Sequence, residues 1–413
     1  MDVKEKTRNL QRSWIMLGCA WLIGFSMYPP MLCIPPVAFI IKKDLGVSHA
    51  AVGLLFSIPV AVLVVLAVPA GFLADRLGTK RAVGIGVVVM AAGSMIRITS
   101  RSYDMLLALT SLYAIGFSLI YPNLPKLVGL WFPREKVGLA TGVYATGITA
   151  GAGIALAITL PLIFPLTHTI QGTFFIWSIP AVVAAVLWWI LAKDPPLLRN
   201  NPGHASSMDR IVGPSPSLLK NKNMWIIALM LFINNVHFYT WSGWGPTLLM
   251  MKGASPDLAA LITSSRAWVG LPTIFLMPWI SHKVGLRKPF IWGSALLLAF
   301  ASWGAIHISV PMGWLLMVVI GVTLSGTFPM ILAFPLEMLP NQSVGTASGT
   351  VLSIGYIGGL LGPWLAGHVV DSSASLDSTL VVLGVIAILW ALIGFLAPET
   401  GRRAQRAPHG ADS

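Results

Sequence analysis

The sequence predicts an all-α membrane protein in which twelve transmembrane helices form two related bundles of six. Three observations support this prediction: a very apolar composition, twelve separate apolar stretches, and a pattern of residues that recurs after 207 positions. Of 413 residues, 56% are apolar and only 10% are charged. Soluble domains carry about 25% charged residues, so this composition excludes soluble enzymes, nucleic-acid-binding proteins and disulfide-rich secreted domains.

The apolar stretches are long enough to cross a membrane as helices. A helix needs about 20 apolar residues to span about 30 Å of hydrocarbon, and charged or turn-forming clusters bound each stretch. The first apolar stretch follows a basic segment and is too long for the apolar core of a cleaved signal peptide. We expect the spans near residues 13–41, 49–74, 82–99, 105–131, 138–163, 172–192, 223–250, 257–281, 289–308, 313–336, 345–370 and 378–397.

The distribution of basic residues predicts the orientation of the chain. If both termini lie in the cytoplasm, the cytoplasmic segments contain 20 of the 27 Lys and Arg residues. The outer loops then contain five, including Arg97, which this assignment makes an anchor at the membrane interface. Because basic residues favour the cytoplasmic side, the sequence predicts a multi-pass protein of the cytoplasmic membrane. The net charge of +13 thus reflects membrane topology rather than nucleic-acid binding.

A single long polar stretch divides the chain into two halves. Residues 193–222 are rich in Pro, Ser, Asn and Gly and predict a cytoplasmic linker. The predicted domains are therefore an N-terminal bundle at 1–192 and a C-terminal bundle at 223–413, which ends in a short cytoplasmic tail.

The two halves match at a constant offset. GFLADRLGTKR (71–81) aligns with PWISHKVGLRK (278–288), and VGLATG (137–142) aligns with VGTASG (344–349). Upstream, Gly46 and Ser48 align with Gly253 and Ser255. Parallel six-helix repeats of this kind place a transport site between the halves near the membrane midplane.

Glycines are spaced in the fifth and eleventh spans so that helices can approach closely. Gly147 and Gly151 lie four residues apart, as do Gly355 and Gly359, which is the small-xxx-small spacing of helix contacts in lipid. Tight packing is the favoured interpretation, and a sliding contact between the halves is the alternative.

The loop at 71–81 closely resembles the signature loop of the major facilitator superfamily. Gly71 and Gly78 permit close approach and a tight reversal, and the loop also contains Asp75, Arg76, Lys80 and Arg81. Thr79 departs from the pattern, because many members are basic there, and His282 stands in the second copy where Asp75 stands in the first. The resemblance implies rocker-switch alternating access, a cavity lined by spans 1, 4, 7 and 10, and a cytoplasmic latch formed by this loop. A simple positive-inside anchor is the alternative role.

Arg266 is the most informative candidate residue. Nine residues separate it from Asp257 at the start of its span, which places it about 13 Å deep. An Arg at this depth normally faces the protein interior and finds a partner, yet no Asp or Glu falls in the middle of a span. A substrate anion would supply that partner, since the guanidinium can hold a carboxylate through two hydrogen bonds. Backbone carbonyls, water or an unseen carboxylate are the alternatives. The anion-exchanging and monocarboxylate branches of the superfamily, which this chain resembles, also place an Arg in this span.

Further polar residues complete the predicted site. Asn235 and His237 lie mid-span in NNVHFYTW (234–241), and His237 is also a candidate proton carrier because imidazole titrates near neutrality. Two prolines interrupt the fourth span and free carbonyl groups there. Lys126 in this span either faces the cavity or extends to the interface. The remaining candidates are Tyr28, Tyr121 and Asn123.

The sequence therefore predicts a monomeric secondary transporter of a small anion, by proton symport or anion exchange. The resemblance to cyanate-type and carboxylate or oxyanion branches points to an organic acid, cyanate or a nitrate-like ion. The alternatives are a transporter of neutral or cationic compounds in which Arg266 is structural, and a polytopic enzyme or sensor. No catalytic or metal-ligating motif and no phosphate-binding loop occurs in the sequence, so neither enzymatic activity nor a cofactor is expected.

Overall fold

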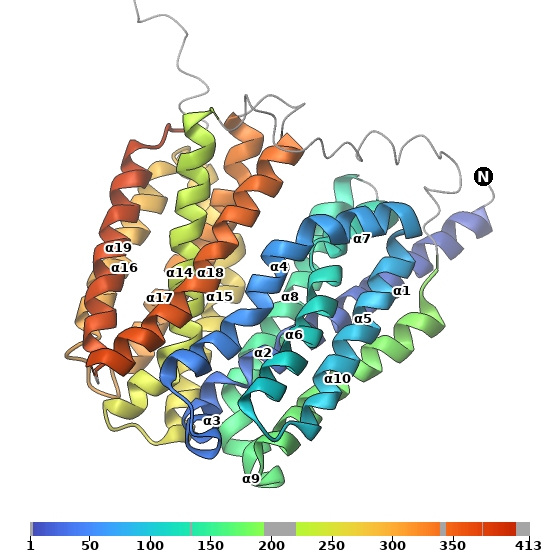
Figure 1. The fold of residues 1–413 in the computed structure, drawn as a ribbon. Helices are drawn as coiled ribbons and strands as arrows, with labels where there is room; N and C mark the ends of the chain where they lie inside the picture. Colours follow the sequence, from blue (N-terminus) through green and yellow to red (C-terminus); the bar gives the residue numbers. More distant parts are fainter. Residues whose placement is uncertain (1–2, 133, 194–219, 339–343, 374, 402–413) are drawn as a thin grey trace, which may run out of the picture. The chain divides into compact units, whose positions relative to one another are not determined.

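The computed structural model describes residues 3–132, 134–193, 220–338, 344–373 and 375–401. These residues are almost entirely helical, which confirms the predicted fold class (Figure 1). The chain divides into two compact units, Met1–Ile211 and Val212–Ser413. Most of the predicted linker, at 194–219, lies outside the described residues.

Unit 1 contains helices that are interrupted in three of its spans. The first span consists of one long helix followed by three short pieces, a break divides the fourth into two helices, and a π-helical turn interrupts the fifth. The elements are α1 (Val3–Met27), α2 (Pro29–Leu32), η1 (Pro35–Val37), α3 (Ala38–Leu45), α4 (His49–Leu77), α5 (Thr79–Ile96), η2 (Arg97–Thr99), α6 (Tyr103–Ile120), α7 (Asn123–Trp131), α8 (Arg134–Ile158), η3 (Thr159–Ile163), α9 (Phe164–Thr167) and α10 (Ile170–Leu191).

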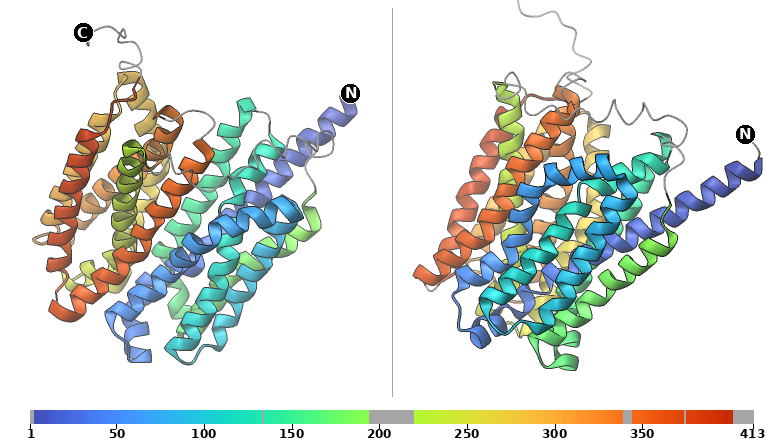
Figure 2. Two further views of the ribbon diagram at one scale, coloured as in Figure 1. Left: turned by 45° about the horizontal axis from the view of Figure 1, so that its top comes forward. Right: turned by 45° about the vertical axis from the view of Figure 1, so that its right-hand side comes forward.

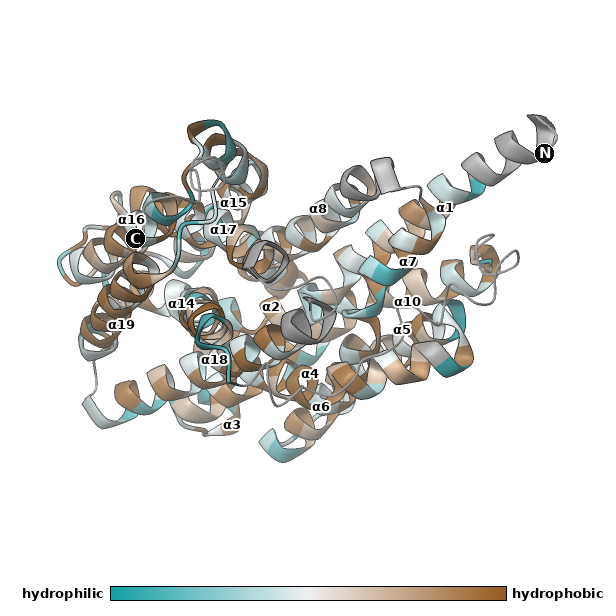
Figure 3. Ribbon diagram, turned by 90° about the horizontal axis from the view of Figure 1, so that it is seen from above, coloured by the Kyte–Doolittle hydropathy of each residue, from teal (hydrophilic) through white to brown (hydrophobic). Residues whose placement is uncertain are grey.

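Unit 2 contains six long helices that run alongside one another (Figures 1 and 2). They are α14 (Lys222–Met251), α15 (Pro256–Val284), α16 (Lys288–Gly304), α17 (Gly313–Met338), α18 (Val344–Ser373) and α19 (Asp377–Leu396). Large apolar side chains remain exposed on many helices, for example Leu396 at 74% and Phe300 at 64%. Apolar residues also dominate the ribbon when it is coloured by hydropathy (Figure 3). Such exposed apolar side chains are suited to contact with lipid tails rather than with water.

Eleven helical stretches in the described part of the chain are long and apolar enough to cross a membrane. The remaining predicted span corresponds to α16, whose 17 residues lie at the lower end of the length that spans a bilayer. The bounds of the stretches agree with the predicted spans to within a few residues, apart from the first, which extends to Leu45.

The predicted repeat recurs in local backbone geometry. Ser48 caps α4 by accepting from the N–H of Ala51 (3.1 Å), and Ser255 caps α15 by accepting from the N–H of Leu258 (3.3 Å). Gly78 and Gly285, which also differ by 207 positions, end α4 and α15 with φ of 84° and 79°. Only glycine adopts this region without a steric penalty.

The glycines of the fifth and eleventh spans pack against a helix of their own unit. A Cβ on Gly151 would lie 2.1 Å from the carbonyl oxygen of Phe25, and a Cβ on Gly358 would lie 2.1 Å from that of Phe232. Phe25 and Phe232 are again 207 residues apart. The interpretation as a tight packing position is thus confirmed for Gly151, and Gly358 packs in the same way.

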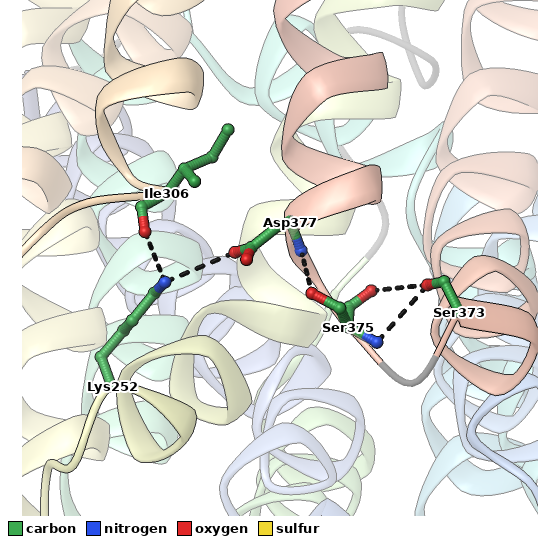
Figure 4. Close-up of polar contacts among 5 residues, drawn as sticks. All are labelled: Lys252, Ile306, Ser373, Ser375 and Asp377. Atoms are coloured by element: carbon green, nitrogen blue, oxygen red, sulfur yellow. Dashed lines mark hydrogen bonds and ion pairs between the residues drawn. The ribbon is translucent and has the colours of Figure 1, made fainter.

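One end of unit 2 is tied together by Lys252, which follows α14. Its ammonium group donates to the carbonyl oxygen of Ile306 after α16 (2.5 Å) and lies 3.4 Å from a carboxylate oxygen of Asp377 at the start of α19 (Figure 4). The N–H of Asp377 in turn donates to the hydroxyl of Ser375 (3.0 Å). The Lys252 side chain therefore links the loop after α14 to the loop after α16 and to the start of α19.

The expectation that Arg97 anchors unit 1 at the membrane interface is wrong. Its side chain is completely buried, and its guanidinium lies over the rings of Tyr113 on α6 and Phe174 on α10, at 5.4 and 4.5 Å from their centroids. The sequence places Arg97 at the end of an apolar stretch, but the packing of α6 and α10 encloses it.

Candidate functional site

Arg266 lies on α15 and points toward α14. Its side chain is 3% exposed, and its Nη2 donates a hydrogen bond to the hydroxyl of Ser242 (2.6 Å). The guanidinium also lies over the ring of Phe238, 4.6 Å from the centroid. The ring face attracts the positive charge. The two α14 groups that contact the guanidinium, a hydroxyl and an aromatic ring, are both uncharged.

Two features of Arg266 leave it able to bind a further group. Its Nε has no hydrogen-bond partner among the described residues, and within the same residues no carboxylate oxygen lies within 4.0 Å of the guanidinium. A buried charge without a counter-charge is costly. An anion that reaches the guanidinium would remove part of this cost.

Ser242 and Phe238 are functional candidates that the sequence reasoning did not identify. They lie one helical turn apart on α14, and the Ser242 hydroxyl donates to the carbonyl oxygen of Phe238 (2.5 Å) while it accepts from Arg266. Phe238 and Ser242 are four residues apart, at and just after the polar stretch 234–241. Because residues at i and i+4 share a helix face, this spacing could have indicated that the two side chains act together.

The backbone around Arg266 is held by close contact with α17. A Cβ on Gly321 would lie 2.5 Å from the carbonyl oxygen of Arg266, and a Cβ on Gly270 would lie 2.5 Å from the hydroxyl oxygen of Ser325. These glycines allow α15 and α17 to approach closely at Arg266 and one turn beyond it, which holds the Arg266 backbone against α17.

The polar residues of α14 are distributed over different faces of the helix. Asn235 precedes Ser242 by seven residues, or about two turns, so the two share a face; the Nδ2 of Asn235 is buried without a partner in the described part of the chain. Asn234 instead donates to Thr327 (3.1 Å) and to the carbonyl oxygen of Leu324 (3.3 Å), and so joins α14 to α17.

His237 lies on a different face from the Arg266 contact. Five residues separate it from Ser242, which corresponds to about 140° around the helix. Its neighbours one turn away, Ile233 and Trp241, belong to the apolar core of unit 2. His237 is completely buried, and neither ring nitrogen has a partner among the described residues.

In unit 1, the structure brings Tyr28 and Tyr121 together around one ring. Tyr28 contacts the Phe117 ring edge to face (5.7 Å between centroids), and Tyr121 stacks on the same ring (5.5 Å between centroids). Both tyrosines make further interactions within the molecule. Phe117 is therefore the residue that positions these two candidates relative to each other.

Asn123 and Lys126 lie on α7 in different surroundings. Asn123 is 1% exposed, and its Nδ2 donates to the carbonyl oxygens of Leu119 (2.8 Å) and Ala70 (3.2 Å). It thereby ties the break between α6 and α7 to α4. Lys126 is half-buried and also has an interaction partner.

The signature loop joins α4 to α5 by a sharp reversal at Gly78. Arg76 and Arg81 are exposed, and the carbonyl oxygen of Lys80 accepts a hydrogen bond from the indole of Trp188 on α10 (3.1 Å). Gly71 is half-buried on α4, and the side chain of Asp75 lies outside the described residues. The loop is thus fixed to α10 of its own unit through its backbone.

Glu399 after α19 is a third residue that the sequence reasoning missed. Its carboxylate accepts from the backbone N–H groups of Arg287 (2.7 Å), Lys288 (3.1 Å) and Gly401 (2.8 Å). Arg287 and Lys288 stand at the start of α16, where backbone donors lack helical partners and a carboxylate is favourable. Glu399 therefore caps the second copy of the loop.

In the described part of the chain, two related helical units with an apolar exterior are typical of multi-pass membrane transporters. The chain belongs to the Major Facilitator Superfamily, whose family model matches residues 16–253 and 249–412.

Many relatives match most of the chain, among them the following three. It is 25% identical over 396 residues to the uncharacterized transporter YycB of Bacillus subtilis, with 94% of each chain covered. It is 24% identical to the cyanate transport protein CynX of Escherichia coli (85% of this chain, 89% of that protein). It is 25% identical to a gallate transporter of Pseudomonas putida (95% and 94%).

Solved structures show the same fold. The D-xylose-proton symporter superimposes with a TM-score of 0.77 at 16% identity and covers 94% of this chain and 98% of that one. The family and these relatives consist of transporters, which argues against an enzyme.

Proposed function

We propose that this protein transports a small anion across the membrane by alternating access, with Arg266 binding the anionic group. The observation that carries the proposal is the environment of Arg266: a buried guanidinium contacted by a hydroxyl and an aromatic ring, with no carboxylate within 4.0 Å among the described residues. The names of two relatives, a cyanate and a gallate transporter, support the same substrate class.

Other polar residues are proposed to contact the substrate in addition to Arg266. Asn235 shares the helix face of Ser242, and its unpartnered Nδ2 is a donor suited to an anion. Tyr28, Tyr121 and Lys126 of unit 1 are also proposed to contact the substrate during transport. Asn123 would act indirectly, because it already holds the break of the fourth span.

The signature loop would act as a conformational latch, with Asp75, Arg76, Lys80 and Arg81 contacting groups outside their own helix. We also propose that both termini face the cytoplasm, as the basic residues predict, and that the protein works as a monomer in the cytoplasmic membrane. Both proton symport and anion exchange are compatible with this site.

A transport assay on purified protein in liposomes tests the proposal. Uptake of labelled cyanate, nitrate, gallate and acetate is compared with uptake of a neutral sugar and an amine, for wild type, Arg266→Lys and Arg266→Gln. We expect saturable uptake of at least one anion, reduced by Arg266→Lys and abolished by Arg266→Gln. Arg101→Gln is the matched control, because Arg101 is exposed.

Two results would contradict the proposal. One is uptake of the sugar or amine by both wild type and Arg266→Gln, with no anion transported; Arg266 would then be structural, and the substrate neutral or cationic. The other is anion uptake that Arg266→Gln leaves unchanged although the variant is folded, which would remove Arg266 from the site.

A further inference from the structure

The first membrane span is broken between α1 and α3 by two pairs of prolines. Pro29 and Pro30 lack an N–H group and cannot continue the hydrogen bonds of α1. After the break, the N–H of Met31 donates to the carbonyl oxygen of Tyr28 (3.0 Å), and the N–H of Ile34 donates to the carbonyl oxygen of Met31 (3.3 Å). The carbonyl groups of Met27 and Pro30 therefore lose the backbone donors that a continuous helix would supply.

Two side chains from neighbouring helices satisfy these two carbonyl groups. The phenol of Tyr113 on α6 donates to the carbonyl oxygen of Met27, and Nη1 of Arg97 donates to that of Pro30 (2.8 Å). The Arg97 guanidinium lies over the Tyr113 ring itself. Buried carbonyl groups without donors are costly in a membrane, so both contacts stabilise the broken form of the span.

Among the described residues, aromatic rings rather than an acidic side chain compensate the charge of Arg97. Its Nε and Nη2 have no hydrogen-bond partner among the described residues, and the guanidinium lies 4.5 Å from the centroid of Phe174 on α10. The rings of Phe174 and Tyr113 attract the cation through their faces. Arg97 thus connects the break to both α6 and α10.

We propose that Arg97 and Tyr113 form a two-point clamp that fixes the break of the first span and positions Tyr28 beside it. Tyr28 lies between the two clamped carbonyl groups in the sequence, and its ring contacts Phe117, which also contacts Tyr113 (6.1 Å between centroids). The clamp holds this segment at a fixed angle to α6. Its effect on substrate binding rests on the proposed function, whereas the clamp itself does not.

The chain contains a natural reporter for the clamp. Cys33 is completely buried, and its thiol donates to the same carbonyl oxygen of Pro30 that Arg97 binds (3.5 Å). Cys19, the other cysteine of the protein, lies on α1 before the break and is also buried. The two thiols therefore report on the segments after and before the break.

The test measures the rate at which N-ethylmaleimide modifies each cysteine in the purified full-length protein. Cys33 is followed in a Cys19→Ala background and Cys19 in a Cys33→Ala background, at a temperature well below the melting midpoint of every variant. We expect Arg97→Met to speed the labelling of Cys33 at least about tenfold, because local opening exposes protected groups, and to leave Cys19 unchanged.

Further variants separate the clamp from general loosening. Arg97→Lys keeps the charge and a donor and should restore part of the protection of Cys33. Arg101→Met, at an exposed position four residues later, should have no effect. Unchanged labelling of Cys33 in Arg97→Met, or an equal increase at Cys19, would overturn the proposal.

If Arg97→Met does not fold, Tyr113→Phe decides by the same criteria. This variant removes only the hydroxyl and keeps the ring beneath the guanidinium. Faster labelling of Cys33 alone supports the clamp, and labelling at the wild-type rate excludes it. Neither outcome depends on which substrate the protein transports.

Discussion

Gly151 and Gly358 occupy equivalent positions in the two units. Each presents its Cα to the carbonyl oxygen of a phenylalanine on the first helix of its unit, Phe25 or Phe232, and a Cβ at either glycine would lie 2.1 Å from that oxygen. The two contacts recur at the offset of 207 residues that also relates the helix caps. Close helix packing is therefore a property of the repeat.

Substitution of either glycine by alanine should destabilise the protein. The added methyl group cannot fit without moving a backbone, and overpacking of this kind costs about 1–3 kcal/mol. The melting midpoint of Gly151→Ala and Gly358→Ala in detergent should fall. Gly18→Ala is the control, because a Cβ there meets nothing within 4 Å; midpoints equal to that of the control would contradict the packing argument.

Removal of the Ser242 hydroxyl tests the environment of Arg266. In Ser242→Ala, Nη2 loses the acceptor at 2.6 Å, and an unsatisfied buried donor costs about 1–3 kcal/mol. We expect a lower melting midpoint without ligand and a larger increase on addition of the transported anion, since the anion then supplies the missing acceptor. Ser265→Ala, which removes a hydroxyl that donates to the carbonyl oxygen of Ile262 on the same helix, is the control. An unchanged response to the anion would argue that Ser242 and the anion do not share Arg266.

His237 gives a prediction that separates packing from proton coupling. Because it lies on the core face of α14 with no partner for either ring nitrogen in the described residues, His237→Leu should fold with equal or greater stability. The pH profile of uptake should also stay the same. A flattened pH profile would instead establish His237 as the proton carrier, despite its position on the helix.

Lys252 should contribute to stability mainly through a carbonyl group. Lys252→Met removes the bond to Ile306 (2.5 Å) and should cost about 1 kcal/mol. Asp377→Asn removes only a half-exposed ion pair, and such pairs contribute about 0–1 kcal/mol. Denaturation of both variants at low and high salt checks this order; a larger and salt-sensitive effect of Asp377→Asn would show that the ion pair dominates.

The two buried arginines show how far the sequence could be interpreted. For Arg266, depth along an unbroken span was enough to predict burial, because a helix rises by a constant amount per residue. For Arg97, position near a span end predicted an interface anchor, and this was wrong. The broken first span and the rings of α6 and α10 enclose it, and contacts between helices distant in the sequence leave no periodic signal.

The sequence by itself determined the helical class, the spans and the repeat, since these depend on hydropathy, helix length and glycine at fixed positions, all of which are local properties. Only the tertiary structure decided which neighbouring helix each polar residue of α14 contacts, and which groups contact each buried charge. Arg266 bonds to Ser242, Arg97 bonds to Pro30, and His237 is completely buried, because packing between helices selects the surroundings of each side chain. The amino-acid order within a single apolar stretch does not specify that choice.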